Sequence, residues 1–249
     1  MNSISIKIPQ QDYFVREAFK SLRTNVQFCG ADKKVIDITS CQPNEGKSTA
    51  SLQLAVSLAQ LGKKTVLVDA DLRKSVMIGT TKPNRKNLLG LTHALVGQTN
   101  LGDILNETDI PNFYIIYAGP VPPNPSELLG GRIFADIIRT LRREFDYIII
   151  DSPPLGSVID SAVIAEQADG VILTIQANAI SYRFALDIKD QIERTGCPLL
   201  GVILNKVDMQ QDRYGKYGKY GKYGKYGKYG RYSKYYGYGE EPDTAEARK

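Results

Sequence analysis

Short runs of β-branched and aliphatic residues alternate with segments of helical periodicity over most of this 249-residue chain. Apolar runs of strand length, bounded by turn residues, predict strands that are buried on both faces. We expect strands at 35–39, 65–68, 113–117, 147–150, 171–175 and 199–204. Helices are expected at 12–28, 48–61, 132–145, 161–167 and 181–195. The alternation predicts an α/β fold, a doubly wound and mostly parallel sheet with helices on both faces.

The composition changes beyond residue 211. Tyrosine recurs at every third position from 214 to 232, mostly as Tyr-Gly-Lys, and the repeat contains no aliphatic residue. Such a segment cannot build a core, so we expect one folded domain at 1–211 and a flexible, disordered tail at 212–249. Residues 212–239 hold eight Lys and Arg against one Asp, so the net charge of +5 originates in the tail. Taken alone, a basic, aromatic tail is also compatible with nucleic-acid binding.

Several classes of protein are excluded by simple counts. No run approaches the ~18 apolar residues of a membrane span, and no secretory leader opens the chain. The three cysteines are scattered and form neither a disulfide framework nor a zinc-binding spacing. A single histidine, His93, argues against histidine-based catalysis. We therefore expect a cytoplasmic protein.

A phosphate-binding loop follows the first expected buried strand. Residues 41–48 read Cys-Gln-Pro-Asn-Glu-Gly-Lys-Ser, the P-loop pattern with Cys41 in place of its first glycine. Backbone N–H groups at the helix start would cradle phosphates, Lys47 would reach the β- and γ-phosphates, and Ser48 would bind Mg²⁺. The fold is thus predicted to be of the P-loop NTPase type. The candidate nucleotide-binding residues are Pro43, Asn44, Glu45, Gly46, Lys47, Ser48 and Thr49.

Carboxylates follow two further strands. Asp69 and Asp71 end the second strand, where alternation puts them on the same side of the extended chain, and Asp151 ends the strand at 147–150. A carboxylate at a strand end can hold Mg²⁺ directly or through water. Together with the P-loop, these residues predict a site for Mg²⁺ and a nucleotide. Arg73, close by, either neutralises phosphate charge or pairs with a carboxylate.

Two other functions remain open at this point. Asn205-Lys206-Val207-Asp208 matches the guanine-reading Asn-Lys-x-Asp pattern, which indicates a GTPase or ATPase switch as an alternative. A nucleotide-gated adaptor that binds ATP without turnover is the second alternative.

The motifs together resemble those of a known family. The P-loop, Asp69-x-Asp71-x-Arg73, Asp151-x-Pro-Pro and the tyrosine-rich tail are similar to those of bacterial protein tyrosine kinases (BY-kinases), in particular the separate cytosolic kinases of Gram-positive capsule and exopolysaccharide systems. The resemblance covers essentially the whole chain, including the Pro-Pro-Asn-Pro-Ser-Glu-Leu segment at 122–128. Gln42 stands where the related septum-site and plasmid-partition ATPases carry a signature lysine, which favours the kinase.

The resemblance implies an ATP- and Mg²⁺-dependent protein tyrosine kinase that autophosphorylates its tail and regulates polysaccharide synthesis and export. Lys47, Asp69, Asp71 and Asp151 would be catalytic, with either Asp69 or Asp71 as the base. Ser48, Asp69 and Asp151 would hold the metal, and Asn205 would contact the adenine edge. The implied phosphoacceptors are Tyr214, Tyr217, Tyr220, Tyr223, Tyr226, Tyr229, Tyr232, Tyr235, Tyr236 and Tyr238.

Partners are implied in the same way. In the family, a Glu-x-x-Arg-x-x-Arg motif in the first helix mediates ring-shaped oligomers. Here it reads Glu17-x-x-Lys20-x-x-Arg23, and lysine lacks the two-pronged pairing that arginine offers a carboxylate. A membrane-spanning activator would complete the ATP site and recruit the chain to the inner face of the cell membrane. A tyrosine phosphatase is expected as well, and nucleic acid is not.

Overall fold

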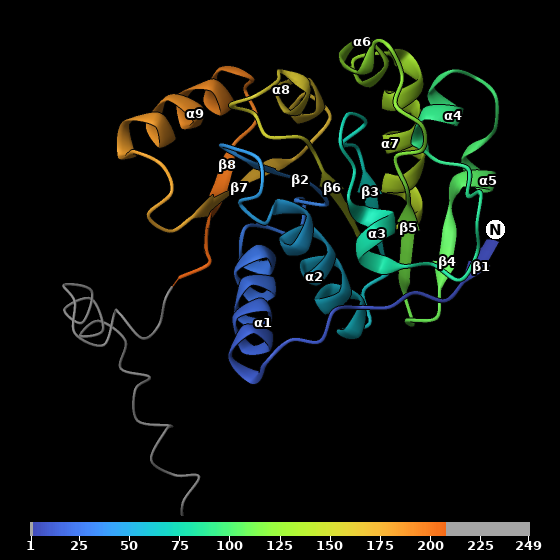
Figure 1. Ribbon diagram of the computed structural model, residues 1–249, viewed down its shortest axis with the longest axis horizontal. Helices are drawn as coiled ribbons and strands as arrows, with labels where there is room; N and C mark the ends of the chain where they lie inside the picture. The colour runs from blue at the N-terminus through green and yellow to red at the C-terminus, as the bar shows by residue number, and fades with distance from the viewer. Residues whose placement is uncertain (1, 208–249) are drawn as a thin grey trace, which may run out of the picture. The chain divides into compact units, whose positions relative to one another are not determined.

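The computed structural model describes residues 2–207 (Figure 1). Residue 1 and residues 208–249 lie outside the described part. The predicted domain boundary at 211, the tail and all ten candidate phosphoacceptor tyrosines are therefore outside it.

The described residues form one eight-stranded sheet. Its strands are β1 (Asn2–Ile4), β2 (Val35–Ser40), β3 (Thr65–Asp69), β4 (Asn106–Thr108), β5 (Phe113–Ile116), β6 (Tyr147–Asp151), β7 (Gly170–Gln176) and β8 (Leu199–Asn205). The order across the sheet is β1-β4-β5-β3-β6-β2-β7-β8, and only β4 and β5 pair antiparallel. The six predicted strands and the mostly parallel sheet are confirmed. The three-residue strands β1 and β4 are too short for a recognisable pattern.

Helices cover both faces of the sheet. Their bounds are α1 (Tyr13–Phe28), α2 (Lys47–Gln60), α3 (Met77–Thr81), α4 (Leu91–Leu95), α5 (Leu101–Ile104), α6 (Pro125–Leu129), α7 (Arg132–Glu144), α8 (Asp160–Ala165) and α9 (Tyr182–Arg194). Successive strand residues point to opposite faces. Accordingly, Val35 packs in the core with α4, α7 and α8, whereas Ile36 packs in the core with α1, α2 and α3 (Figure 1). The doubly wound arrangement is confirmed.

The strand order places the site. β3, β6 and β2 are adjacent and parallel, so their carboxyl ends meet at one edge of the sheet. Ligands of open α/β sheets bind at this edge. The P-loop follows β2, while Asp69 and Asp151 end β3 and β6.

Helix α1 packs only through its second half. Asp12 caps the helix by accepting a hydrogen bond from Val15 N, and Val26 is buried against α2. Phe14 lies three four-residue steps before Val26, on the same face of the helix, but is 77% exposed, so this face is not packed in the first turns. Within the helix motif, Lys20 pairs with Glu17 at 2.7 Å. Its third residue, Arg23, donates through Nη1 to the carbonyl of Ser57 in α2.

Asp37 is a fully buried carboxyl group in the middle of β2. Its Oδ2 accepts a hydrogen bond from Ser161 Oγ at 2.8 Å, and its Oδ1 has no partner among the described residues. Burial is the largest cause that raises the pKa of Asp37, to about 7. The native state therefore keeps a proton that the unfolded chain releases near pH 4. This group lowers the free energy of unfolding progressively as pH rises from about 4 to 7.

We expect the substitution Asp37→Asn to remove this dependence. The melting temperature of the variant minus that of the unsubstituted chain should increase by several degrees from pH 5 to pH 8. A change of ~1 kcal/mol in the free energy of unfolding shifts the melting temperature by roughly 2–4 °C for a chain of this size. Thermal unfolding at several pH values measures the difference. Ser161→Ala is the matched control, because it alters the same contact and keeps the carboxyl group. A pH-independent difference for Asp37→Asn would show that Asp37 ionises normally in the native state.

Candidate active site

The P-loop joins β2 to α2 and contains two left-handed backbone positions. Asn44 has φ 66° and Gly46 has φ 95°. At Gly46 a Cβ would lie 2.1 Å from Nδ2 of Asn205, so only glycine fits without a rearrangement. These turns bring the loop to the first residue of α2, Lys47.

Neighbouring strand ends hold the loop in shape. The buried carboxylate of Glu45 accepts from the backbone N–H groups of Gln42 at 2.8 Å and Gln176 at 3.3 Å. The Glu45 carbonyl accepts from Asn205 Nδ2 at 2.9 Å, and the Asn44 carbonyl accepts from the Lys206 ammonium group. Glu45 and Asn205 are both expected to bind nucleotide. In the structure, their side chains form hydrogen bonds that stabilise the P-loop. The guanine-reading pattern also places Asn205 and Lys206 here, while its Asp208 lies outside the described residues.

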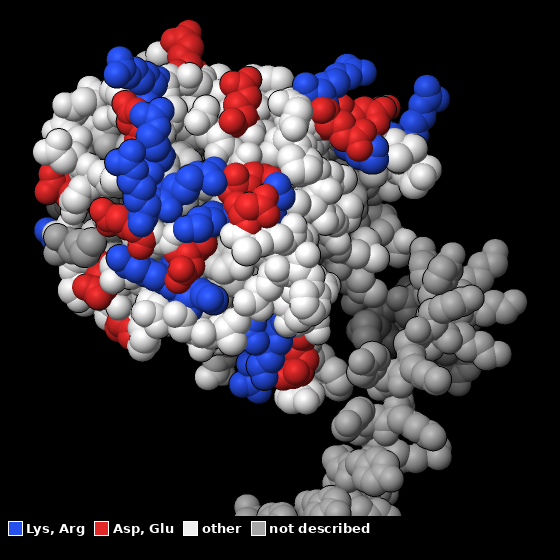
Figure 2. Space-filling view, turned by 180° about the vertical axis from the view of Figure 1, so that it is seen from behind, with Lys and Arg blue, Asp and Glu red and all other residues white. Residues whose placement is uncertain are grey.

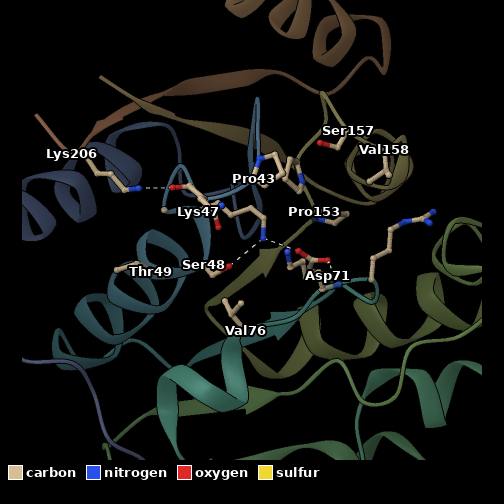
Figure 3. Close-up of a pocket in the computed structure, with 15 residues that line it drawn as sticks. Pro43, Lys47, Ser48, Thr49, Asp71, Val76, Pro153, Ser157, Val158 and Lys206 are labelled. Carbon is tan, nitrogen blue, oxygen red and sulfur yellow. Dashed lines mark hydrogen bonds and ion pairs between the residues drawn. The ribbon is translucent and has the colours of Figure 1, made fainter. Parts of the chain in front are cut away.

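Lys47 lies at the centre of the site. Its Nζ is 2.9 Å from Asp71 Oδ2 and 3.2 Å from Ser48 Oγ (Figure 3). It is also 3.9 Å from Asp151 Oδ1. Burial lowers the pKa of Lys47, but Asp151 and Asp71 outweigh it and raise the pKa above its ordinary value. Lys47 is therefore an ammonium group held among carboxylates.

Asp69 and Asp151 are buried side by side. They are register partners on β3 and β6. Burial, followed by the charge of Asp151, raises the pKa of Asp69 to about 7, and burial also raises the pKa of Asp151. Asp69 accepts a hydrogen bond from Ser75 Oγ, and Asp151 accepts one from Ser51 Oγ at 3.1 Å.

A cavity of about 470 Å³ opens in front of these groups. Its lining residues are Pro43, Asn44, Gly46, Lys47, Ser48, Thr49, Asp71, Arg73, Lys74, Val76, Pro153, Pro154, Ser157, Val158 and Lys206 (Figure 3). Most of the residues predicted to bind nucleotide thus line one cavity. Asp69 and Asp151 lie behind the lining, as do Glu45 and Asn205.

The site contains residues that the sequence analysis missed. Ser51 lies one turn after Lys47 on α2, so i,i+4 spacing on the helix could have indicated it. Ser75, Ser157 and Val158 lie in loops that follow β3 and β6, and no pattern distinguishes them. Of the two roles considered for Arg73, phosphate neutralisation and pairing with a carboxylate, the structure shows the second: Arg73 pairs with Asp160.

Cys41 occupies the start of the P-loop as a core residue. It is fully buried and belongs to the cluster that includes Leu155 and Leu173. Burial raises the pKa of its thiol to about 12. The thiol is therefore protonated and inert at neutral pH.

Comparison with known proteins adds to this geometry. A family model described as an AAA domain matches residues 33–195. A tyrosine-protein kinase CpsD of Streptococcus agalactiae serotype III (strain NEM316) is 49% identical over 199 residues, 80% of this chain and 85% of that protein. The chain belongs to the family of bacterial tyrosine-protein kinases. A putative tyrosine-protein kinase CapB of Staphylococcus aureus is 34% identical, over 80% of this kinase and 87% of the relative.

Two solved structures have a similar fold. The chimerical protein CapA2B2 superposes on this kinase with a TM-score of 0.73 at 35% identity, over 77% of this chain and 84% of the other. The septum site-determining protein MinD of Pyrococcus horikoshii, complexed with Mg-ADP, gives a TM-score of 0.58 at 25% identity, over 69% of each chain. The fold is thus shared with a protein that was solved in complex with Mg-ADP, while the CapA2B2 chimera is the more similar of the two.

Proposed function

We propose that this tyrosine kinase binds ATP with Mg²⁺ in the 470 Å³ cavity and transfers the γ-phosphoryl group to tyrosines of its own tail. One observation carries the proposal: a buried P-loop lysine lies in contact with an acidic side chain of the cavity lining, Asp71. Phosphoryl transfer requires mainly positioning and charge neutralisation, and this arrangement supplies both.

The donor set fits Mg²⁺. Ser48 and Asp151 offer hard oxygen atoms next to Lys47, and three buried carboxylates, Asp69, Asp71 and Asp151, face this single ammonium group. Among residues 2–207, no group of three or more acidic, cysteine or histidine side chains could hold a metal alone. This suits an ion held largely by substrate phosphates. Ser48 and Asp151 would hold Mg²⁺, which would neutralise phosphate charge, and Asp69 would support Asp151 from behind.

Asp71 is the better candidate for the base. It lines the cavity, whereas Asp69 is fully buried and engaged by Ser75. A tyrosine hydroxyl has a pKa near 10 and needs a proton acceptor at neutral pH. In the transfer step the phenol gives its proton to Asp71 and its oxygen bonds to the γ-phosphorus. The bond from that phosphorus to the β–γ bridging oxygen breaks, and ADP leaves.

The Lys47–Asp71 ion pair suggests that ATP binds before Asp71 becomes available as the base. While Lys47 donates to Asp71 Oδ2, this oxygen is engaged by the ammonium group. Bound phosphates would attract Lys47 and free Asp71. Base and substrate would then be ready together.

The regulatory setting follows from the family. We infer that the chain acts in capsular or exopolysaccharide synthesis, recruited to the inner face of the membrane by a spanning activator and reset by a tyrosine phosphatase. No helix within residues 2–207 is long and apolar enough to cross a bilayer, which is compatible with an anchor supplied by another protein. The exposed Tyr13 and Phe14, with the motif of Glu17, Lys20 and Arg23, make α1 the candidate surface for ring assembly.

Nucleic-acid binding finds little support in the described part. Figure 2 shows basic and acidic side chains intermixed on the face that it displays. Ion pairs such as Arg139–Asp136 at 2.7 Å compensate the charges of α7. Binding to a polyanion normally requires a basic surface that is not compensated in this way.

Replacing the ten tail tyrosines by phenylalanine tests the acceptor assignment. We expect the phosphate incorporated by the full chain from Mg-ATP to fall by at least about tenfold, because phenylalanine offers no hydroxyl group. Mass spectrometry of the intact chain counts the phosphates. Substituting Tyr114 and Tyr147 in the folded domain is the control. Unchanged incorporation in the tail variant would place the acceptors elsewhere.

The GTPase alternative is tested by nucleotide competition. Unlabelled ATP should displace labelled ATP from the chain, and GTP should do so only at much higher concentration. Equal displacement by GTP would favour the guanine-nucleotide switch.

A further inference from the structure

Arg73, Asp160 and Ser126 form a hydrogen-bonded cluster at one side of the cavity. Arg73 binds Asp160 with two prongs, Nε to Oδ2 at 2.8 Å and Nη2 to Oδ1 at 2.9 Å. The Ser126 hydroxyl donates to Asp160 Oδ1 at 2.6 Å and accepts from Arg73 Nη2 at 3.1 Å. The cluster is separate from the contacts of Lys47 with Asp71 and Asp151.

The cluster is built as a fixed contact. The Asp160 side chain is completely shielded from solvent, while Arg73 is partly exposed. Burial raises the pKa of Asp160, but the hydrogen bonds of Arg73 and Ser126 outweigh it, and the pKa is lowered overall. Bidentate arginine–carboxylate pairs are among the stronger and more directional contacts in proteins.

Two segments that line the cavity meet α6 in this cluster. Arg73 belongs to the loop after β3, two residues beyond Asp71. Asp160 begins α8, directly after the loop that contributes Ser157 and Val158 to the lining. Ser126 lies in α6, within the proline-rich segment at 122–128, a motif that the reaction itself leaves unused.

Apart from the contact of Lys47 with Asp71, the loop that carries Asp71 makes few hydrogen bonds to the rest of the fold, although Ala70 and Leu72 are buried in the core. Ala70 N donates to the Asp151 carbonyl, and Leu72 N donates to the Ala70 carbonyl. Lys74 N donates to Asp71 Oδ1 from within the same loop. The Arg73 side chain therefore makes the polar link from this loop to α6 and α8, beside the apolar packing of Leu72.

We propose that Asp160 and Ser126 are positioning residues for phosphoryl transfer, which hold Arg73 and thereby aim Asp71 at the acceptor tyrosine. The inference rests on the proposed role of Asp71 as the base. Misplacing a catalytic group by about 1 Å can cost roughly 100-fold in rate. The phosphate-binding residues lie on the P-loop and α2, which the cluster does not contact. Loss of the cluster should therefore lower kcat and leave ATP affinity nearly unchanged.

The test compares two bidentate arginine–aspartate pairs in the full chain. Asp160→Asn should lower kcat for tyrosine phosphorylation by about 10- to 100-fold, with the Kd for Mg-ATP changed less than about threefold. Asp169→Asn is the matched control, because Asp169 also binds an arginine, Arg142, with two prongs at 2.9 Å but lies outside the cavity lining. It should lower the melting temperature without lowering kcat.

Two substitutions of Ser126 supply a second readout that does not depend on folding of the Asp160 variant. Ser126→Ala should lower kcat several-fold, and Ser126→Thr, which keeps the hydroxyl group, should restore most of it. An unchanged kcat in Asp160→Asn, an equal loss in Asp169→Asn, or equal values for the two Ser126 variants would overturn the proposal.

Failure of the positioning role is distinguishable from failure of the proposed function. If the unsubstituted chain forms no phosphotyrosine, the proposed function itself is wrong. If Asp71→Asn keeps its rate while Asp160→Asn loses it, the function stands and the link through Asp71 is wrong.

Discussion

The substitution Lys47→Met is expected to abolish detectable tyrosine phosphorylation, with a loss of about 100- to 1,000-fold or more in kcat/KM. Among the described residues, Lys47 is the only cation within 4 Å of Asp71 and Asp151. Without its charge, the carboxylates would repel the triphosphate, so both nucleotide affinity and kcat should fall. Initial rates of phosphotyrosine formation and calorimetric titration with Mg-ATP measure the two effects.

The control for this variant is Lys64→Met. The Lys64 ammonium group lies over the rings of Tyr114 and Phe145, apart from the cavity lining. Its removal should leave kcat and ATP affinity unchanged. Full activity of Lys47→Met would contradict the assignment of this lysine to the phosphates.

The second large effect is expected for Asp71→Asn. The amide cannot take the phenol proton, and general-base catalysis typically contributes about 100- to 10,000-fold. Mg-ATP should still bind, because Lys47 and Ser48 remain. The rate at pH 7 should therefore fall by at least about 100-fold, with the Kd for Mg-ATP changed by less than about tenfold.

The pH dependence of this variant separates a base from a structural role. As pH approaches the tyrosine pKa near 10, the phenol ionises by itself and needs no acceptor. The rate of Asp71→Asn should rise steeply between pH 7 and pH 9.5 and approach that of the unsubstituted chain. A deficit that stays constant over this range would mean that Asp71 acts otherwise.

The fold and the main site residues were predictable because their signals are local. Each long strand is a mostly apolar run, interrupted in β2 by Asp37. Asp69 and Asp151 stand at the ends of such runs, and Lys47 follows the loop after another, so a parallel sheet brings all three to one edge. The helix at 12–28 was also predictable, but not that Phe14 stays exposed, because burial depends on which neighbours the helix finds.

The supporting contacts could not be predicted because they join distant segments. Arg73 and Asp160 are 87 positions apart, and Asn205 and Glu45 are 160 apart. No spacing rule connects such pairs. The loop-supporting role of Glu45 and Asn205 therefore emerges only from the three-dimensional arrangement, as does the position of Asp69 behind the cavity.

The most direct test of the account is to incubate the full chain with γ-labelled ATP and Mg²⁺ and to identify the labelled amino acid after acid hydrolysis. We expect label on tyrosine in the unsubstituted chain and none in Lys47→Met. Label released only as free phosphate, or no transfer by protein that is saturated with Mg-ATP, would contradict it.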